Sequence, residues 1–547
     1  METNKNTKVT DEEIANGIKD EYGCIYSPDG KRLLKGNKEY TIKEGTEVIC
    51  DSAFESDCFD NYSLKSIVIP DSVTEIGSYA FCGCRSLQSI DIPDSVTEIG
   101  KDAFSGCSSL QSIVIPESVI KIGERAFDRC YSLKTIVIPK SVTEIGVKPF
   151  DLGKEITSNS KRFVVKDDLL IDLEEKRLIQ CLKDKEHIVI PDSVTEIGKR
   201  AFILCESQSI VIPDSVTKIG ESAFWGCEFL QSIVIPNSVT EIGNRAFAWC
   251  RFLQSIVIPD SVTEIGYSAF MLCESLQSIV IPDSVTKIGY SAFEGCESLQ
   301  SIVIPDSVTK IGDEAFSDCW SLQNIVIPES ITEIGDRAFS GCRLLENIVI
   351  PNSVTEIGSM PFPLGIELTS HSNRFVVEDD LLIDLEGKRL IQCLKDKDAV
   401  VIPESVTEIG EGAFSDCESL KSIVIPESVT KIGSRPFRVR IKITSHSERF
   451  IVKNDLLIDV AEKRLIQCLK NKKHVDIPNS VTEIGDRAFY DCKSLQSIVI
   501  PDSVTKIGYS AFQNCESLQS IVIPKGTKEQ FENVLGKKYH HLLKEME

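Results

Sequence analysis

The sequence predicts a repeat solenoid, a stack of short parallel strands, rather than several globular domains. Three observations support this prediction. A unit of 23 residues recurs along most of the 547-residue chain (Pro282 to Pro305, for example), and each unit holds an alternating Ile-x-Ile segment followed by proline. No unit has enough apolar residues to fold alone, so copies must bury them against one another.

The prolines of the Ile-Pro dipeptides mark the register of the repeat. Most neighbours lie 23 residues apart, and three intervals of 52 residues separate Pro139 from Pro191, Pro351 from Pro403 and Pro426 from Pro478. With a degenerate copy that begins at Thr41, the chain holds about 18 repeats, which we call rungs.

Each rung follows the consensus L-x-x-I-x-I-P-x-S-V-T-E/K-I-G-x-x-A-F-x-x-C. The alternation at Ile302-Val303-Ile304 predicts a short strand with both isoleucines inward, which ends at Pro305 because proline has no N–H for a ladder. A second extended piece, from Val308 to Ile311, ends at Gly312. The x-x-A-F-x-x-C segment is too short for an independent helix, and we expect one helical turn that packs Ala and Phe inward.

Each 52-residue interval contains a second repeated sequence, such as RFVVEDDLLIDLEGKRLIQCLK from Arg374. Its pattern of strand, polar turn and strand predicts a β-hairpin ornament on a continuous solenoid. Pro149, Pro361 and Pro436 replace the usual Ala just before each interval, and we expect them to stop the helical turn so that the chain leaves the solenoid.

The predicted organisation is a solenoid with capped ends and three ornaments. It comprises an N-terminal segment with a capping β-hairpin (1–40), rungs (41–150), ornament 1 (151–187), rungs (188–362), ornament 2 (363–399), rungs (400–437), ornament 3 (438–474), rungs (475–526) and a C-terminal capping helix (527–547). For that helix, the apolar residues Phe531, Val534, Leu535, Leu542 and Leu543 recur at helical spacing.

The consensus, with L-x-x-I-x-I-P followed by S-V-T-E-I-G-x-x-A-F-x-x-C, resembles the BspA-like leucine-rich repeats over about residues 41–526. The resemblance implies a leucine-rich-repeat solenoid with a parallel β-sheet on its concave face and short helical turns on the other side. It also implies a surface or secreted protein that adheres to host proteins or to other cells.

The residue between the two inward isoleucines points outward and is usually valine. Gln and Ser precede it, so the strands present a long face with an apolar stripe, and contiguous exposed apolar surface often marks partner binding. A plain preference of valine for strands is the alternative. The near-identity of the rungs leaves no variation that would mark a footprint. The predicted protein-binding residues are Val211, Val234, Val257, Val280, Val303, Val326, Val349, Gln300 and Ser301.

Cysteine is the most conspicuous candidate for chemistry, with 20 residues in the chain. We expect buried, reduced thiols that pack as small apolar groups, with disulfides between stacked neighbours and a metal site as alternatives. The core of this structural column is Cys227, Cys250, Cys273, Cys296, Cys319 and Cys342, and the same rung position holds Cys58, Cys84, Cys107, Cys130, Cys205, Cys417, Cys492 and Cys515.

The sequence predicts no catalytic residue, metal or cofactor. Acidic residues often follow the rung proline, as Asp283 and Asp306 do, and a calcium site is the alternative to an ordinary turn, but Asn237 and Asn352 interrupt the column. The ornament carboxylates recur in three copies, which argues for structure because an active site needs one asymmetric constellation. They are Asp168, Asp172, Asp380, Asp384, Asp455 and Asp459, with Arg177, Arg389 and Arg464 nearby.

The composition limits the classes of molecule that we expect this protein to bind. A net charge of −23 and a pI near 4.9 argue against nucleic acid, whose binding needs Lys and Arg, and no apolar run is long enough to insert into a membrane. We expect a non-enzymatic protein-binding scaffold, a monomer with an unidentified protein partner. The resemblance favours a surface or secreted adhesin, whereas the amino terminus as written has no apolar signal segment and favours an intracellular interaction scaffold. A hydrolase in the ornaments is a remote third reading.

Overall fold

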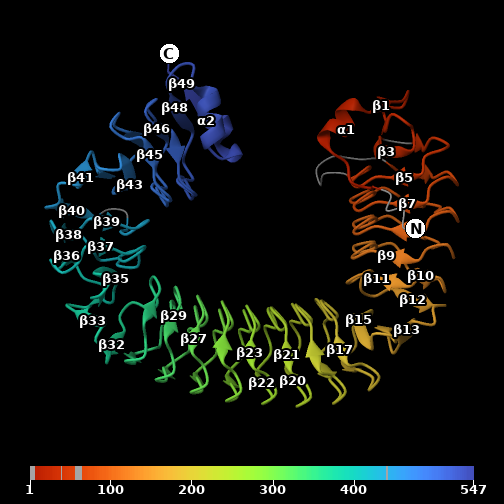
Figure 1. Cartoon of the computed structure of the whole chain (residues 1–547), viewed down its shortest axis with the longest axis horizontal. Coiled ribbons are helices and arrows are strands. Elements are labelled where there is room, and N and C mark those ends of the chain that lie inside the picture. The colour runs from red at the N-terminus through yellow and green to blue at the C-terminus, as the bar shows by residue number, and fades with distance from the viewer. Residues whose placement is uncertain (1–5, 38–39, 56–63, 439–440, 547) are drawn as a thin grey trace. The chain divides into compact units, whose positions relative to one another are not determined.

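The computed structural model, which describes residues 6–37, 40–55, 64–438 and 441–546, confirms a solenoid of parallel strands (Figure 1). The chain divides into two units, Met1–Ser284 and Val285–Glu547, and each is described by itself. In both units a rung contributes two short strands to two separate parallel ladders, one from the Ile-x-Ile segment and one from the E/K-I dipeptide.

The two ladders follow directly from the consensus. In unit 1, β20 (Ser232–Val234) pairs in parallel with β22 (Ser255–Val257), so that Ile233 lies beside Ile256. On the other ladder, β19 (Lys218–Ile219) pairs with β21 (Glu241–Ile242). The isoleucines of both ladders are buried, as the period of two predicts.

The remaining elements of unit 1 repeat this arrangement. The N-terminal elements are α1 (Asp11–Asn16), β1 (Ile18–Lys19), β2 (Ile25–Tyr26) and β3 (Arg32–Lys35). The E/K-I strands are β5 (Val48–Ile49), β7 (Glu75–Ile76), β8 (Glu98–Ile99), β9 (Lys121–Ile122), β11 (Glu144–Ile145), β17 (Glu196–Ile197) and β23 (Glu264–Ile265). The other ladder contains β4 (Tyr40–Thr41), β6 (Ile67–Val68), β10 (Thr135–Ile138), β12 (Glu155–Ser158), β16 (His187–Val189), β18 (Ser209–Val211) and β24 (Ser278–Val280).

Unit 2 is built in the same way. Its E/K-I strands are β25 (Lys287–Ile288), β27 (Lys310–Ile311), β29 (Glu333–Ile334), β31 (Glu356–Ile357), β37 (Glu408–Ile409), β39 (Lys431–Ile432), β45 (Glu483–Ile484) and β47 (Lys506–Ile507). The other ladder contains β26 (Ser301–Val303), β28 (Asn324–Val326), β30 (Asn347–Ile350), β32 (Glu367–Ser370), β36 (Ala399–Val401), β38 (Ser422–Ile425), β40 (Lys442–Ser445), β44 (His474–Asp476), β46 (Ser497–Val499) and β48 (Ser520–Ile523).

The x-x-A-F-x-x-C segment differs from the expected helical turn. In the rung of Phe247 it forms two successive tight turns, closed by the Ala246 N–H to the Gly243 carbonyl (3.1 Å) and the Cys250 N–H to the Phe247 carbonyl (3.3 Å). Arg245 and Trp249 precede Ala246 and Cys250 with φ of 56° and 65°. A left-handed residue in each turn prevents a right-handed helix from forming.

A column of phenylalanines runs through the core of each unit. In unit 1, the rings of Phe224 and Phe247 lie 5.0 Å apart and those of Phe247 and Phe270 lie 5.6 Å apart, almost parallel. The Phe224 N–H also donates to the Ala246 carbonyl of the next rung (2.8 Å). Each phenylalanine is therefore fixed by its neighbours through both ring packing and backbone hydrogen bonds, and its burial stabilises the fold by about 1.5–3 kcal/mol.

The polar and glycine positions of the consensus also serve the stacking. The Ser238 hydroxyl donates to the Val216 carbonyl of the preceding rung (2.6 Å), and the Thr240 hydroxyl donates to the Thr217 carbonyl (3.3 Å). A Cβ atom on Gly123 would lie 2.5 Å from the backbone of Gly100, which is too close for any side chain. The repeated S-V-T-E/K-I-G sequence is thus a set of contacts between rungs.

The hairpins in the three long intervals lie across the core. In ornament 1, β13 (Phe163–Lys166), β14 (Leu169–Asp172) and β15 (Arg177–Cys181) form an antiparallel sheet, and β15 then pairs in parallel with β17. The equivalent strands are β33 (Phe375–Glu378), β34 (Leu381–Asp384) and β35 (Arg389–Cys393) in ornament 2, and β41 (Phe450–Lys453), β42 (Leu456–Asp459) and β43 (Arg464–Cys468) in ornament 3.

The second and third strands of each hairpin are buried on both faces, so they are internal partitions and not ornaments on the surface of a continuous core. In ornament 3, Leu457 and Ile466 pack with the core that precedes the hairpin, whereas Leu456 and Leu465 pack with the core that follows it. Successive residues of a strand point to opposite faces, and here each face closes a different stretch of core. We therefore call these three segments inserts.

A buried glutamine completes the rung that ends at each insert. The side-chain amide of Gln392 accepts a hydrogen bond from the Phe362 N–H (3.2 Å) and donates one to the Phe362 carbonyl (2.8 Å). Gln180 and Gln467 bond to Phe150 and Phe437 in the same way. The amide takes the place of the next rung's backbone, which satisfies two groups that would otherwise be buried without partners.

The two ends of the chain are closed differently. At the N-terminus, β2 and β3 form the predicted capping hairpin, and β3 begins the E/K-I ladder by pairing with β5, as β15 does with β17. At the C-terminus, the predicted helix over 527–547 is shorter. It consists of α2 (Lys528–Val534), a 3₁₀ turn (Lys537–Leu542) and a final strand, β49 (Leu543–Glu545), which pairs with β48. The open edge of β48 offers unpaired backbone groups, and a strand can form hydrogen bonds with them whereas a helix cannot.

An arginine–aspartate pair closes each hairpin of the inserts. Asp384 is almost fully buried and accepts two hydrogen bonds from the Arg374 guanidinium (2.9 and 2.8 Å) and one from the Gly387 N–H (3.0 Å). Burial alone would raise the pKa of the Asp384 carboxyl, but the hydrogen bonds from Arg374 and Gly387 hold this pKa below its ordinary value. Asp172 pairs with Arg162 and Asp459 with Arg449 in the same geometry.

We predict that Asp384→Asn lowers the free energy of unfolding by about 3 kcal/mol, because it leaves a guanidinium without its buried partner. The lowered pKa means that the ionised carboxylate stabilises the fold above the unfolded-state pKa of about 4, and that this stabilisation is lost as pH falls through the folded-state pKa. Denaturant unfolding from pH 7 to pH 3 should therefore show a flatter acid dependence for the variant. Asp398→Asn breaks an exposed pair with Lys421 (2.9 Å) and is the matched control, with an expected loss below about 1 kcal/mol. Equal losses for the two variants would contradict the assignment.

Candidate protein-binding surface

The valines predicted to point outward are exposed on the Ile-x-Ile ladder. Val234, Val257 and Val280 lie in register on β20, β22 and β24 of unit 1, and Val303 pairs with Val326 on β26 and β28 of unit 2. The exposed fraction of the predicted residues ranges from 42% to 78%, for Val211, Val234, Val257, Val280, Val303, Val326 and Val349. The structure thus places the predicted side chains in one row within each unit, which we call the valine stripe.

Polar residues border the valine stripe on one side. Gln300 and Ser301 are both exposed next to Val303, and Gln323 is exposed at the equivalent position of the next rung. The stripe is therefore one valine wide, with amide and hydroxyl groups beside it. Such a surface offers dispersion contacts and hydrogen bonds to an extended partner, and no acid–base chemistry.

Two members of the valine stripe were missed by the sequence reasoning. Val189 and Val401 follow inserts 1 and 2 and are exposed at the same ladder position, on β16 and β36. The I-V-I-P sequence at Val189 and the V-V-I-P sequence at Val401 carry the same signal as the other rungs. At Asp91 and Asp476 the stripe holds an exposed carboxylate in place of valine.

Among the described residues the cysteine column is buried, except for the half-buried Cys515, and forms no disulfide; Cys58 lies outside these residues. The thiols mostly donate to the carbonyl of a phenylalanine in the preceding rung, as Cys250 does to Phe224 (3.2 Å) and Cys342 to Phe316 (3.1 Å). Burial raises the pKa of the Cys84, Cys130 and Cys273 thiols to about 12. A protonated thiol that caps a backbone carbonyl accounts for cysteine at this position better than packing alone.

The insert carboxylates are all held in local ion pairs. Asp172 pairs with Arg162 and not with the nearby Arg177, which instead contacts Glu175 (2.8 Å). Asp168 contacts Lys185 (2.8 Å), and Asp380 and Asp455 have lysine partners in the same way. Within the described ranges, no three His, Cys, Asp or Glu side chains gather so that they could hold a metal ion.

A comparison with known protein families shows which family this chain belongs to. The BspA type leucine rich repeat region matches residues 38–161, 179–297, 263–372, 392–448 and 462–541, in six copies. This protein belongs to the BspA-type leucine-rich-repeat family. The residues left unmatched between these segments, 162–178, 373–391 and 449–461, hold the first two strands of each insert's hairpin.

Solved structures include several similar leucine-rich-repeat proteins. A leucine rich cell surface protein from Faecalibacterium prausnitzii is 31% identical, with 69% of this chain and 98% of that chain covered and a TM-score of 0.45. A leucine-rich repeat protein from Eubacterium ventriosum is 22% identical (66% and 98% covered, TM-score 0.49), and the pneumococcal vaccine antigen PcpA is 18% identical (72% and 89% covered, TM-score 0.33). A comparison with curated proteins finds no match. None of the helices among the described residues is both long and apolar enough to cross a membrane.

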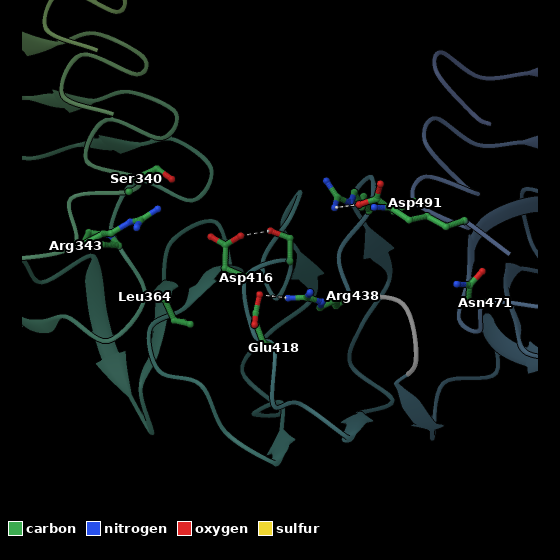
Figure 2. Close-up of a pocket in the computed structure, with 13 residues that line it drawn as sticks. Ser340, Arg343, Leu364, Asp416, Glu418, Arg438, Asn471 and Asp491 are labelled. Carbon is green, nitrogen blue, oxygen red and sulfur yellow. Dashed lines mark hydrogen bonds and ion pairs between the residues drawn. The ribbon is translucent and has the colours of Figure 1, made fainter. Parts of the chain in front are cut away.

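A recess of about 890 Å³ lies in unit 2 of this BspA-type protein, and Ser340, Leu364 and Asn471 are among the residues that line it (Figure 2). Its charged groups are largely paired with one another. Arg438 contacts Glu418 (2.6 Å), as Figure 2 shows, and Arg435 contacts Asp491 (3.8 Å). The recess therefore presents a surface of mixed charge, on which two arginines are paired with carboxylates.

We predict that the thiols of this BspA-type protein resist alkylation in the native state. Only Cys82 and Cys515 are partly exposed among the described cysteines, and protonated, buried thiols react slowly because the thiolate is the nucleophile. Of the described cysteines, iodoacetamide labelling followed by peptide mapping should modify these two at most under native conditions, and all of them in urea. Labelling of Cys227 or Cys250 at equal rates in both conditions would contradict the buried column.

Proposed function

We propose that the chain is a non-enzymatic scaffold that binds an extended segment of a partner protein along the valine stripe. Leucine-rich repeats generally bind proteins, and repeat solenoids commonly use a strand face for this purpose. The row of exposed valines in register, flanked by glutamine and serine, is the single observation that supports this choice of surface. Each contact is weak, and the affinity comes from their number.

We place the protein at the cell surface or outside the cell, as an adhesin, because its family includes such proteins. An intracellular interaction scaffold is the alternative, and the described cysteines favour it, since no disulfide joins any of them and a reducing compartment preserves thiols. Catalysis has no part in either version, because repeat scaffolds of this family are generally non-enzymatic and the insert carboxylates serve ion pairs.

The valine stripe is tested by Val234→Glu, Val257→Glu and Val280→Glu combined. Three carboxylates on one apolar row should lower the amount of captured partner at least tenfold, about 1.4 kcal/mol, in a pull-down from host-cell or own-cell extract. The control Asn237→Glu with Lys218→Glu changes the net charge by the same three units. Both substitutions introduce a residue that other rungs carry at the same position, namely Glu117 at the position of Asn237 and Glu241 at that of Lys218. Unchanged capture by the valine variant would refute the surface.

Location is tested on the protein taken from its own cells. An adhesin should be cleaved when intact cells are treated with a protease, whereas an intracellular scaffold should survive until the cells are lysed. A thiol count on the unreduced protein gives a second reading, because blocked thiols together with surface cleavage exclude the intracellular alternative.

A further inference from the structure

Four consecutive rungs of unit 1 depart together from the repeat between Phe and Cys. Their residues at these two positions are Ile203-Leu204, Trp225-Gly226, Ala248-Trp249 and Met271-Leu272. At the first position, the other described rungs carry Cys82, Ser105, Asp128, Glu294, Ser317, Ser340, Ser415, Tyr490 and Gln513. The fold is stable with polar residues there, so a run of four apolar ones serves something other than stacking. This variation is the footprint that the sequence reasoning overlooked.

The backbone at the second position makes these residues costly. Trp249, Leu204 and Leu272 have φ of 65°, 58° and 58°, in the left-handed region that favours glycine, asparagine and aspartate. Other rungs place Gly106, Gly295 or Asn514 there. Large apolar side chains held in a disfavoured backbone conformation are typical of functional surfaces.

A pocket of about 380 Å³ lies on the turn side of unit 1, and five of the departing residues line it: Ile203, Trp225, Ala248, Trp249 and Met271. The indole rings of Trp225 and Trp249 lie 6.2 Å apart and are tilted by 47°, and with Ile203 and Met271 they form the apolar part of the pocket lining. The two indoles are two of the chain's three tryptophans. Trp and Met are enriched at protein interfaces, and Trp is frequent among the residues that dominate binding energy.

The only charged residues that line the pocket are arginines, in a protein whose net charge is −23. Arg200 contacts Glu124 (3.2 Å), but Arg245 donates only to the Tyr267 hydroxyl (2.7 Å) and stacks on that ring. Across the described part of the chain, no carboxylate lies within ion-pair distance of Arg245. The Arg245 guanidinium is therefore available to pair with an anionic group of a bound molecule.

We propose that this pocket binds a short segment of a partner protein in which an Asp or Glu stands next to a large apolar residue. The carboxylate meets the Arg245 guanidinium, whose planar donors suit a carboxylate, and the apolar side chain lies between Trp225 and Trp249. The site is separate from the valine stripe and stands whether or not the stripe binds a partner.

A displayed library of random 12-residue peptides, screened against the full chain, tests the proposal. Selected peptides should be enriched in Asp or Glu adjacent to Phe, Leu or Trp. Trp225→Ser and Trp249→Gly, which restore residues found at Ser105 and Gly106, should fold normally and bind the selected peptides at least tenfold more weakly. Arg245→Gln should lower the affinity for these peptides about tenfold. It should change little the affinity for peptides in which Gln or Asn replaces the acidic residue.

Two controls separate this site from the rest of the surface. Trp320→Phe removes the remaining tryptophan and should leave peptide affinity unchanged, and a selected peptide should alter the indole fluorescence of this variant as it does that of the native chain. The triple valine variant should also bind the peptides normally, so failure of the valine stripe and failure of this pocket are distinguishable. Enrichment of basic peptides, no enrichment, or binding only to polygalacturonate used as an anionic polysaccharide probe would overturn the proposal.

Discussion

Each rung of this protein supplies the hydrogen bonds that its neighbour lacks, and the rest of the structure depends on that exchange. The Phe224 N–H reaches the Ala246 carbonyl of the next rung, while the Cys250 thiol reaches back to the Phe224 carbonyl. Serine and threonine hydroxyls add further bonds to the preceding rung. Buried backbone groups must be paired, so a rung without its neighbour would leave several of them unsatisfied.

The inserts follow from the same constraint. Where the chain leaves the solenoid, the next rung's backbone is no longer available, and a glutamine amide such as that of Gln392 replaces it. The hairpin then presents apolar side chains on both faces and begins a new ladder with its last strand, as the N-terminal hairpin does. The protein can be understood as a series of capped stretches of rungs, whose caps are held by the Arg374–Asp384 pair and its equivalents.

Only the positions that stacking leaves free are available to bind a partner. Inward positions are nearly invariant because every residue must fit a copy of itself above and below. Valine is favoured at an exposed strand position whatever the partner, so the valine stripe says little about which partner is bound. The pocket of Trp225 and Trp249 is different, because its residues depart from the local pattern and Trp249 occupies a backbone conformation that favours a smaller residue. Specificity is therefore more readily built at the turns than on the strands.

The sequence by itself determined the solenoid, the register of the rungs, the inward isoleucines and phenylalanines, and the outward valines, because these depend on period and on repetition. Tertiary structure decided three other matters. The A-F-x-x-C segment turns through left-handed residues instead of a helical turn, the hairpins lie within the core, and the C-terminal segment ends as a strand on β48. Each of these depends on buried backbone groups whose hydrogen-bond partners lie in a different part of the chain, as the Phe362 N–H is bonded to the side chain of Gln392. A local sequence pattern does not specify which partner lies close enough.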